Sequence, residues 1–416
     1  MIRKIIMPIL ALTFALTSCA DPSAGSGVPE FFRDVKIVSA GLYHTVAIKT
    51  DGTLWAWGNN SSGQLGDGTT FASSIPVQVS DPDPSKQWIA VSAGAGHTAA
   101  IKTDGTLWAW GGNTYGQLGN ADSGYYDPPT NTKPKYSPIP VQVSDPDPSK
   151  QWIAVSASAG MHTIAIKKDG TLWAWGWNSY GKLGDGTTTT RDTPVQVSDP
   201  DPSKQWVAIS AGSYHTAAIK ANGTLWAWGI GGGQLGIGTG GDSYIPKQVG
   251  TAEQKTEGWK WQYVSAGLYH TVAIKTDGTI WAWGANSYGQ LGDGTSGSAN
   301  IPVQVKADAA TPFTGVIAVS AGRHHTVAIK KDGTLWAWGD NEYYGQLGIG
   351  VSDDNPHPYP VFVGNMWKSV SAANDQTVAI KNDGVLWAWG YNENGQLGDA
   401  TVKNKFSPVR VILSNW

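Results

Sequence analysis

The sequence predicts an all-β protein, a seven-bladed β-propeller built from four-stranded antiparallel blades. Seven near-copies of one repeat run through the chain, and each contains the word Leu/Ile-Trp-Ala-Trp-Gly. Successive words are 51 to 65 residues apart, a period typical of arrays of small β-units. A turn-forming Asp-Gly or Asn-Gly pair precedes every word. The words occupy residues 54–58, 107–111, 172–176, 225–229, 280–284, 335–339 and 386–390.

Three strands are expected in the first half of each repeat. In the first copy these are residues 35–41, 44–49 and 53–58, the second of which alternates apolar and polar positions. Asp51-Gly52 separates the second strand from the third, and this pair is typical of a type I′ hairpin turn. The period of two in a strand places Trp55 and Trp57 on one face.

A glycine-rich loop, residues 59–68, and a proline-led strand, residues 76–79, complete the repeat. Because proline suits an edge strand, we expect this fourth strand at the rim of the blade. Stacking into an open solenoid is the alternative, but it requires atypical terminal repeats, which the chain lacks. Closure into a ring is therefore favoured, with residues 35–39 as candidates to pair across the junction with residues 409–411.

Composition limits the classes of function. The repeats fill residues 35–416, which leaves no room for a second domain. The formal net charge is −3 and no basic stripe is present, so nucleic acid is not an expected partner. Only one cysteine occurs, so stability must come from a packed core rather than from disulfides.

The N-terminal segment predicts export and lipid anchoring. A positive start with Arg3 and Lys4 precedes a short apolar stretch, residues 5–16, which is too short to span a bilayer. The segment ends in Leu-Thr-Ser-Cys, which resembles a bacterial lipobox, with lipidation of Cys19. A plain secretory signal is the alternative. We expect residues 1–18 to be a lipoprotein signal peptide and residues 19–34 a lipidated, flexible tether. These features predict a lipid-anchored protein of the bacterial cell envelope, at the outer membrane or cell surface.

Histidine and tryptophan recur at fixed places in the repeat. A ring of histidines suggests a metal or proton site, but one copy per blade, with Gln376 in the seventh, favours structural hydrogen bonds. The paired tryptophans of each word favour packing between blades over exposed platforms for sugars. The six histidines are His44, His97, His162, His215, His270 and His325.

Two further motifs resemble ligand sites and are rejected. Residues 231–236 match a dinucleotide-binding glycine pattern, but no helix is expected to follow. Three copies of Ser-Asp-Pro-Asp-Pro-Ser-Lys-Gln-Trp, at residues 80–88, 144–152 and 198–206, lack the calcium-loop pattern and predict connectors between blades. No motif indicates catalysis, so we expect no enzyme activity, no cofactor and no metal.

The full repeat word, Ser-Ala-Gly-x-x-His-Thr-x-Ala-Ile-Lys-x-Asp-Gly-Thr-Leu-Trp-Ala-Trp-Gly-x-Asn-x-x-Gly-Gln-Leu-Gly, resembles that of the regulator of chromosome condensation family. The resemblance covers the chain from Val35 onward and implies a seven-bladed propeller. Functions in the family are diverse: nucleotide exchange on a small GTPase, ultraviolet-B sensing in plants, and β-lactamase inhibition by secreted bacterial propellers. The resemblance therefore implies protein contact through one face, without naming the partner.

Departures from the repeat indicate where a partner binds. The second repeat carries an insert, residues 121–140, and the sixth a long loop with Asp353, Asp354 and His357. All these segments follow the same strand, so in a propeller they share one face. Neutral drift of the loops is the alternative. The candidate partner-binding residues are Tyr125, Tyr126, Lys133, Lys135, Tyr136, Trp177, Tyr343, Tyr344 and Tyr359.

These observations predict a non-enzymatic propeller, anchored in the envelope, that binds an unidentified protein through its loop face. The lipid bilayer is a second partner through Cys19. A lectin-like propeller that binds surface glycan is the main alternative. Nucleotide exchange on a small GTPase, implied only by the resemblance, is less favoured because an exported protein would not meet a cytosolic GTPase.

Overall fold

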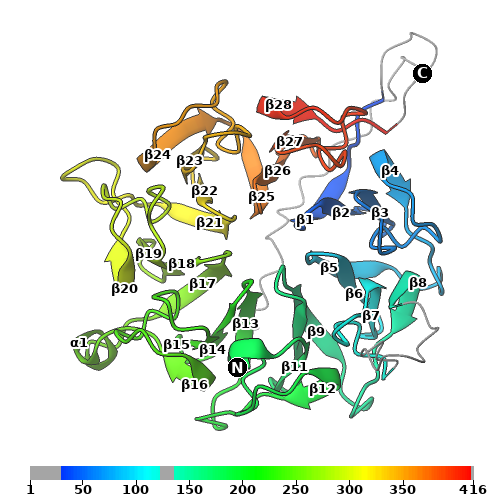
Figure 1. Ribbon diagram of the computed structural model, residues 1–416, viewed down its shortest axis with the longest axis horizontal. Coiled ribbons are helices and arrows are strands. Elements are labelled where there is room, and N and C mark those ends of the chain that lie inside the picture. The colour runs from blue at the N-terminus through cyan, green and yellow to red at the C-terminus, as the bar shows by residue number, and fades with distance from the viewer. Residues whose placement is uncertain (1–29, 122–134, 414–416) are drawn as a thin grey trace, which may run out of the picture.

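The computed structural model describes residues 30–121 and 135–413, which form a closed ring of seven blades (Figure 1). Each blade is a four-stranded antiparallel sheet made of consecutive strands. In the first blade these are β1 (Val35–Ala40), β2 (His44–Lys49), β3 (Leu54–Gly58) and β4 (Ser73–Gln78). The first strand lies at the central channel and the fourth at the rim. The predicted fold is confirmed.

The other blades repeat this order. Helix in the described part of the chain is limited to η1 (Ser179–Gly181) and α1 (Ala252–Thr256). The strands of blades 2 to 7 are β5 (Trp88–Ala93), β6 (His97–Lys102), β7 (Leu107–Gly112), β8 (Tyr136–Gln142); β9 (Trp152–Ala157), β10 (His162–Lys167), β11 (Leu172–Gly176), β12 (Arg191–Gln196); β13 (Trp206–Ala211), β14 (His215–Lys220), β15 (Leu225–Gly229), β16 (Ser243–Gln248); β17 (Trp261–Ala266), β18 (His270–Lys275), β19 (Ile280–Gly284), β20 (Ala299–Gln304); β21 (Val316–Ala321), β22 (His325–Lys330), β23 (Leu335–Gly339), β24 (His357–Gly364); β25 (Trp367–Ala373), β26 (Gln376–Lys381), β27 (Leu386–Gly390) and β28 (Lys405–Arg410).

Two local predictions need correction. The Asp-Gly turns are not type I′, because Gly52 has a φ of 82° whereas Asp51 is not among the residues with positive φ. Instead, the Asp51 carboxylate accepts hydrogen bonds from the amide (2.9 Å) and hydroxyl (2.7 Å) of Thr53. The outer strand also begins before its proline, at Ser73 rather than Pro76, because its ladder continues past a bulge to Gly58. As an edge strand it tolerates the missing amide donor.

The ring has two faces of different construction. The loop face carries the turns between the first two strands and the long loops between the last two, such as residues 41–43 and 59–72 in blade 1. The connector face carries the Asp-Gly turns and the links between blades, such as residues 50–53 and 79–87. The loops of the loop face differ in sequence between blades, and so do the links of the connector face, one of which contains α1.

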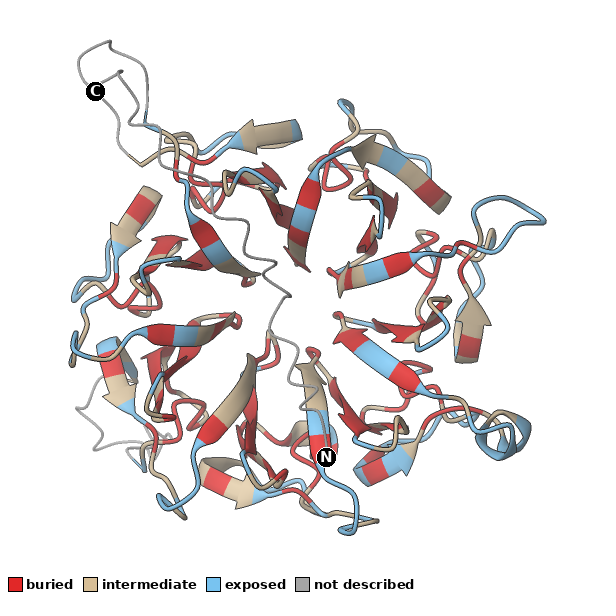
Figure 2. Cartoon of the chain, turned by 180° about the vertical axis from the view of Figure 1, so that it is seen from behind, coloured by how far each residue is buried: buried red, intermediate tan, exposed pale blue. Residues whose placement is uncertain are grey.

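The hydrophobic core consists of seven layers, one between each pair of neighbouring blades (Figure 2). In the first layer, Leu54 and Ala56 of blade 1 pack against Trp88 and Trp110 of blade 2. The second tryptophan of each repeat word is fully buried, as Trp57 is. The predicted packing role of these tryptophans between blades is confirmed.

One backbone carbonyl joins each blade to the next. The Gln64 carbonyl accepts hydrogen bonds from Thr98 Oγ1 (2.9 Å) and Trp110 Nε1 (3.0 Å) of the following blade. We call this pair of bonds the carbonyl clasp. It recurs at all seven junctions, with the carbonyls of Gln64, Gln117, Lys182, Gln234, Gln290, Gln346 and Gln396 as acceptors.

The repeat histidines complete the clasp, as the sequence predicts. His44 Nε2 lies 2.9 Å from Thr98 Oγ1. Because that hydroxyl already donates its proton to the clasp, His44 must be the donor and carry its proton on Nε2. Burial lowers the pKa of His44 to about 3 and of His97 to about 4, so the imidazoles are neutral. The same contact joins His97, His162, His215, His270 and His325 to threonines of the next blade.

A second ring of hydrogen bonds surrounds the channel. The hydroxyl of Ser39 accepts a hydrogen bond (3.1 Å) from the amide of Ala93 in the next blade. Every junction has this contact, including the one between blades 7 and 1. The accepting serines are Ser39, Ser92, Ser156, Ser210, Ser265, Ser320 and Ser371.

The junction between blades 7 and 1 is also joined by the start of the described chain. Phe31 pairs with Ile412 as a β-bridge, and the Phe32 amide donates to the Val411 carbonyl (2.9 Å). The Phe32 side chain is buried against Trp57. Gln376, in the histidine position, donates from Nε2 to the carbonyl of Gly41 (2.9 Å). The pairing with the last residues of blade 7 therefore comes from Phe31 and Phe32 rather than from residues 35–39, although the Val35 amide also donates to the Gly384 carbonyl of blade 7 (3.3 Å).

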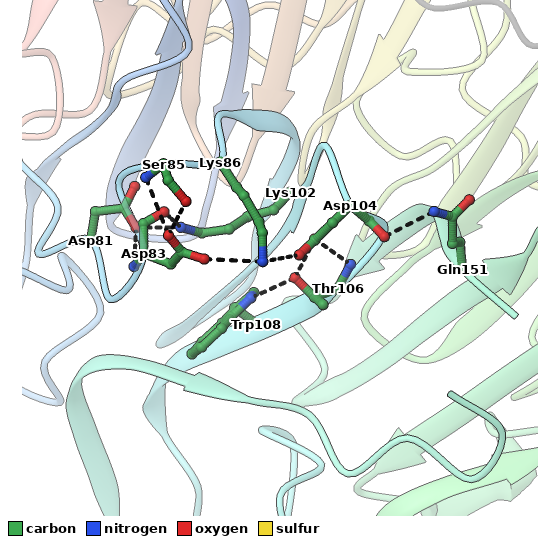
Figure 3. Close-up of polar contacts among 9 residues, drawn as sticks. All are labelled: Asp81, Asp83, Ser85, Lys86, Lys102, Asp104, Thr106, Trp108 and Gln151. Atoms are coloured by element: carbon green, nitrogen blue, oxygen red, sulfur yellow. Dashed lines mark hydrogen bonds and ion pairs between the residues drawn. The ribbon is translucent and has the colours of Figure 1, made fainter. Parts of the chain in front are cut away.

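The Ser-Asp-Pro-Asp-Pro-Ser-Lys segments are connectors that hold a buried lysine (Figure 3). Lys102 pairs with Asp81 and donates to the Asp83 carbonyl (2.6 Å). Its ammonium lies 4.5 Å from the centre of a Trp88 ring. A buried charge needs such partners, and the aspartates serve this need. The other two connectors hold Lys167 and Lys220 in the same way.

We predict a steep loss of stability in mild acid. Below about pH 6.5 the histidines of the unfolded chain become protonated, whereas the buried imidazoles of the folded protein stay neutral. The free energy of unfolding therefore falls as the pH falls. Each histidine contributes at most about 1.4 kcal/mol per pH unit. Asp375 acts in the opposite direction. Because burial raises its pKa to about 6, the folded state binds a proton there in mild acid that the unfolded state does not bind.

Urea unfolding at pH 7.5, 6 and 5 measures how the free energy of unfolding changes with pH. His325→Gln, which copies Gln376, should reduce this pH dependence by about one histidine's share, and equal midpoints at all three pH values would contradict the assignment.

A second prediction concerns the carbonyl clasp. Thr98→Val preserves shape but leaves the His44 Nε2 proton buried without an acceptor, which costs about 1–3 kcal/mol. Urea unfolding followed by tryptophan fluorescence gives the loss. Thr103→Val is the matched control, because Thr103 is exposed in the neighbouring turn. If both variants unfold at the same urea concentration, the clasp does not stabilise the ring.

Candidate functional site

Aromatic side chains gather on the loop face. They come from three variable places in the repeat: before the histidine, after Trp-Ala-Trp-Gly, and before Gly-Gln-Leu-Gly. These positions are adjacent in sequence to the residues that join the blades. The side chains at these variable positions take no part in joining the blades and lie at the surface. We call the following group the aromatic belt: Tyr43, Tyr115, Trp177, Tyr180, Tyr214, Tyr269, Tyr288, His324, Tyr343, Tyr344 and Tyr391.

One run of the belt crosses blades 3 to 6. The rings of Tyr214 and Tyr269 are stacked, with centroids 5.5 Å apart and planes 17° apart. Tyr269 is stacked in turn on His324 at 5.8 Å, and Tyr180 meets the edge of Tyr214 at 6.5 Å. Tyr180 and Tyr269 remain exposed. Contacts between rings on different blades therefore hold these side chains in place before any partner arrives.

A second run crosses blades 6, 7 and 1. Tyr344 and Tyr391 meet edge to face at 5.0 Å, and Tyr391 meets Tyr43 in the same way at 6.4 Å. Tyr343 lies beside Tyr344, at 6.1 Å, and is 66% exposed. Such edge-to-face pairs are favourable arrangements of aromatic rings. The belt thus continues across the junction where the ring closes.

Trp177 is held by its neighbours. Its ring stacks on Tyr115 at 5.3 Å, and the ammonium of Lys182 lies 3.9 Å from its centre. Lys182 stands where the other repeats have glutamine, and it donates to the Gly160 carbonyl (2.6 Å). Burial lowers the pKa of Lys182 to about 7. The half-buried Trp177 therefore has a fixed orientation on blade 3.

Charge on the belt is uneven. The turns and loops of blades 6 and 7 carry seven carboxylates, with Arg323 and Lys403 as the basic side chains. Arg323 Nη1 lies 3.7 Å from Asp375, whose side chain is only 5% exposed. Burial raises the pKa of Asp375 to about 6, against the opposing effect of Arg323. The carboxylates belong to Asp340, Glu342, Asp353, Asp354, Asp375, Glu393 and Asp399.

The structure places the predicted binding residues in three groups. Trp177, Tyr343 and Tyr344 belong to the belt. Tyr136 is exposed at the start of β8, the Lys135 carbonyl accepts the amide of Asn113, and Tyr359 packs over Gly294 of blade 5. These three residues lie at the outer rim of the loop face. Tyr125, Tyr126, Lys133 and Cys19 lie outside the described residues. The binding role of all of them stays a prediction.

Most of the belt was missed by reasoning from the inserts. Tyr43, Tyr214 and Tyr269 stand directly before repeat histidines, and Tyr180 and Tyr288 directly before the glycine of the clasp loop. The signal was available, since these positions vary between repeats yet hold a tyrosine in several of them. It is found by asking which variable positions flank the structural ones.

The channel offers little room for a ligand. Serine, alanine and glycine from the ends of the inner strands line a cavity of about 160 Å³, with Arg323 at its loop-face mouth. In the described ranges, no three His, Cys, Asp or Glu side chains gather closely enough to hold a metal ion. None of the helices described is long and apolar enough to cross a membrane. The belt is accordingly the strongest candidate site.

Comparison with known proteins identifies the family. A sequence model of the RCC1-like domain matches residues 128–416, and models of the regulator of chromosome condensation (RCC1) repeat match residues 35–64, 51–101 and 88–117. The ultraviolet-B receptor UVR8 of Arabidopsis thaliana is 32% identical over 387 residues, which cover 92% of this chain and 83% of the receptor.

Solved structures share the fold at lower identity. Human WBSCR16 superposes with a TM-score of 0.73 at 20% identity, over 86% of this chain and 93% of that one. Prp20p of Saccharomyces cerevisiae gives 0.72 at 20% identity, over 89% and 87%. From the extent of the family match and the identity to the plant receptor, the chain belongs to the RCC1-like domain family of seven-bladed propellers.

Proposed function

We propose that this protein is a non-enzymatic binding propeller, anchored in the bacterial cell envelope, that holds a protein partner through the aromatic belt. The observation that carries the proposal is the belt itself. Tyrosine and tryptophan dominate the energetics of protein interfaces, and rings held by one another lose little entropy on binding. Prp20p, which shares this fold, has binding properties to Gsp1p and histones.

The proposed anchor is compatible with a partner on the loop face. Residues 30–35 run along the connector face, where the Leu386 and Thr50 amides donate to the carbonyls of Phe32 and Asp34. Residues 19–29 span at most roughly 40 Å when fully extended. A lipidated Cys19 would therefore keep the connector face nearer the membrane and direct the belt toward the surroundings.

Protein binding is favoured over the alternatives. A sugar platform requires a free ring face, but Trp177 already contacts Tyr115 and Lys182. The tyrosines of the first run stack on one another and present edges rather than one flat surface. Nucleotide exchange on a small GTPase would require the protein to be in the cytosol, which conflicts with the proposed export.

We predict that belt substitutions weaken capture of the partner. Crosslinking pull-downs from envelope extract compare the full-length protein with a Tyr214→Ser/Tyr269→Ser variant. Removing two interface tyrosines should weaken binding by about tenfold or more. Val207→Ser/Ile317→Ser, which removes exposed apolar groups near the connector face, is the control and should capture normally. A protein captured equally by all three baits argues against the belt. Deletion of residues 122–134 tests the insert separately, and recovery of glycan alone would favour the lectin alternative.

We also predict that Cys19 carries the anchor. Labelling cells with a radioactive fatty acid should mark the wild-type protein and leave Cys19→Ser unlabelled and released from the membrane fraction. An unlabelled wild-type protein that retains residues 1–18 in the cytoplasm would overturn both the anchor and the envelope location.

A further inference from the structure

Blade 3 departs from the repeat at two places that meet in space. Its turn between β9 and β10 is one residue longer than in the other blades, because His162 stands six positions after Ser156 where the other repeats have five. Lys182 stands where the other six repeats have glutamine. Its Nζ donates a hydrogen bond to the Gly160 carbonyl (2.6 Å), which belongs to the longer turn. The two departures therefore form one contact.

The ammonium group of Lys182 joins three parts of the loop face. Besides Gly160, it reaches the carbonyl of Ser213 in the turn of blade 4, at 3.4 Å. It also lies 3.9 Å from the centre of the Trp177 ring, a distance at which a cation is attracted to the ring face. Tyr214 of the belt follows Ser213 directly. One side chain thus contacts Trp177 and both turns, including the turn that carries Tyr214.

This charge is buried without a counter-ion. Lys182 is fully buried, and within the described ranges no carboxylate pairs with it. Its own loop carries Asp185, but that carboxylate is paired with Arg191 (2.9 Å). Burial alone lowers the pKa of Lys182 to about 7, because an ammonium group loses its hydration in such a site. Charged and neutral forms of the side chain therefore coexist near neutral pH.

Loss of the proton weakens each of these contacts. A neutral amine keeps N–H groups for the two carbonyls, but hydrogen bonds from an ionised donor are about twice as strong. The attraction to the Trp177 ring requires the positive charge and ends with it. The neutral form of Lys182 leaves Trp177 with its stacking on Tyr115, at 5.3 Å. Trp177 is therefore held less firmly when Lys182 is neutral.

We propose that Lys182 is a proton-controlled clamp, which orders Trp177 and the adjoining turns of blades 3 and 4 in mild acid and releases them in mild base. The clamp acts on the belt and not on the ring, because the clasp at this junction uses the backbone carbonyl of Lys182 rather than its side chain. Its effect on binding rests on the proposed function: the partner meets an ordered Trp177 in mild acid and a released one in mild base.

The other titratable groups around Lys182 do not change charge near neutral pH. His162 on β10 feels the charge of Lys182, and His215 begins β14 after the turn of blade 4. Burial lowers the pKa of His162 well below its usual value and that of His215 to about 3, so both stay neutral. At the surface are the phenols of Tyr180 and Tyr214, and burial raises the pKa of Tyr214 above its usual value. A change near pH 7 on this blade is therefore assigned to the lysine.

Fluorine NMR of the full-length protein labelled with fluorotryptophan tests the clamp. The resonance missing from a Trp177→Phe variant identifies Trp177. This resonance should shift with a midpoint near pH 7, because Lys182 passes from about 90% charged at pH 6 to about 10% at pH 8. Lys182→Gln, which copies the other repeats, should give one position at every pH. Lys204→Gln, which removes an exposed lysine of the connector face, is the matched control and should shift as the wild type does.

Three results would overturn the inference. A Trp177 resonance that does not move over this range would mean that no clamp operates. A shift retained in Lys182→Gln would mean that another group drives it, and Lys182→Met makes the same comparison if the glutamine variant does not fold. Loss of the shift in Lys204→Gln would mean a diffuse effect of net charge.

The clamp and the proposed function fail separately. If the Trp177 resonance does not shift while Tyr214→Ser/Tyr269→Ser still loses the partner, the clamp fails and the proposed function stands. If the resonance shifts as expected while that variant keeps the partner, the clamp stands and the belt is not the binding surface.

Discussion

The carbonyl clasp is the interaction on which the rest of the ring depends. A propeller blade has no core of its own, and its stability comes from the layer that it shares with each neighbour. At every junction one carbonyl accepts both a threonine hydroxyl and a buried indole N–H, which fixes the distance and the angle between two blades. Because the acceptor belongs to the backbone, the side chain at that position is free to change, and Lys182 replaces glutamine without loss of the clasp.

This division of labour explains where the candidate site lies. His44 and Trp57 are fully buried and have equivalents in the other repeats. The tryptophan makes the same contact at all seven junctions, and the histidine makes its contact at six. Their immediate neighbours, such as Tyr43, emerge on the loop face and differ from blade to blade. The scaffold therefore presents variable side chains at fixed places around the channel. The belt is made in this way.

The fold could be predicted from the sequence because every repeat carries the same local signals. The spacing of the Trp-Ala-Trp words, the glycines of the hairpins and the proline of the edge strand are local signals. The turn type was wrong because Asp51 acts through its carboxylate, which stabilises a turn that does not require positive φ at that residue. The belt could not be assembled in advance, since contacts such as Tyr214 with Tyr269 join residues about one repeat apart. The ion pair between Arg323 and the buried Asp375 likewise joins two blades and is encoded by no motif.

The junction between blades 7 and 1 determines when the ring can close during synthesis of the chain. Phe32 enters its layer only when Val411 and Leu386 are present to receive it, so the ring cannot close until nearly the whole polypeptide has been synthesised. Blades made earlier have one unprotected side until then. If the protein is exported as we propose, this delay would leave the chain unfolded enough to pass through a narrow channel. The same circular architecture that makes the finished molecule rigid thus postpones its own completion.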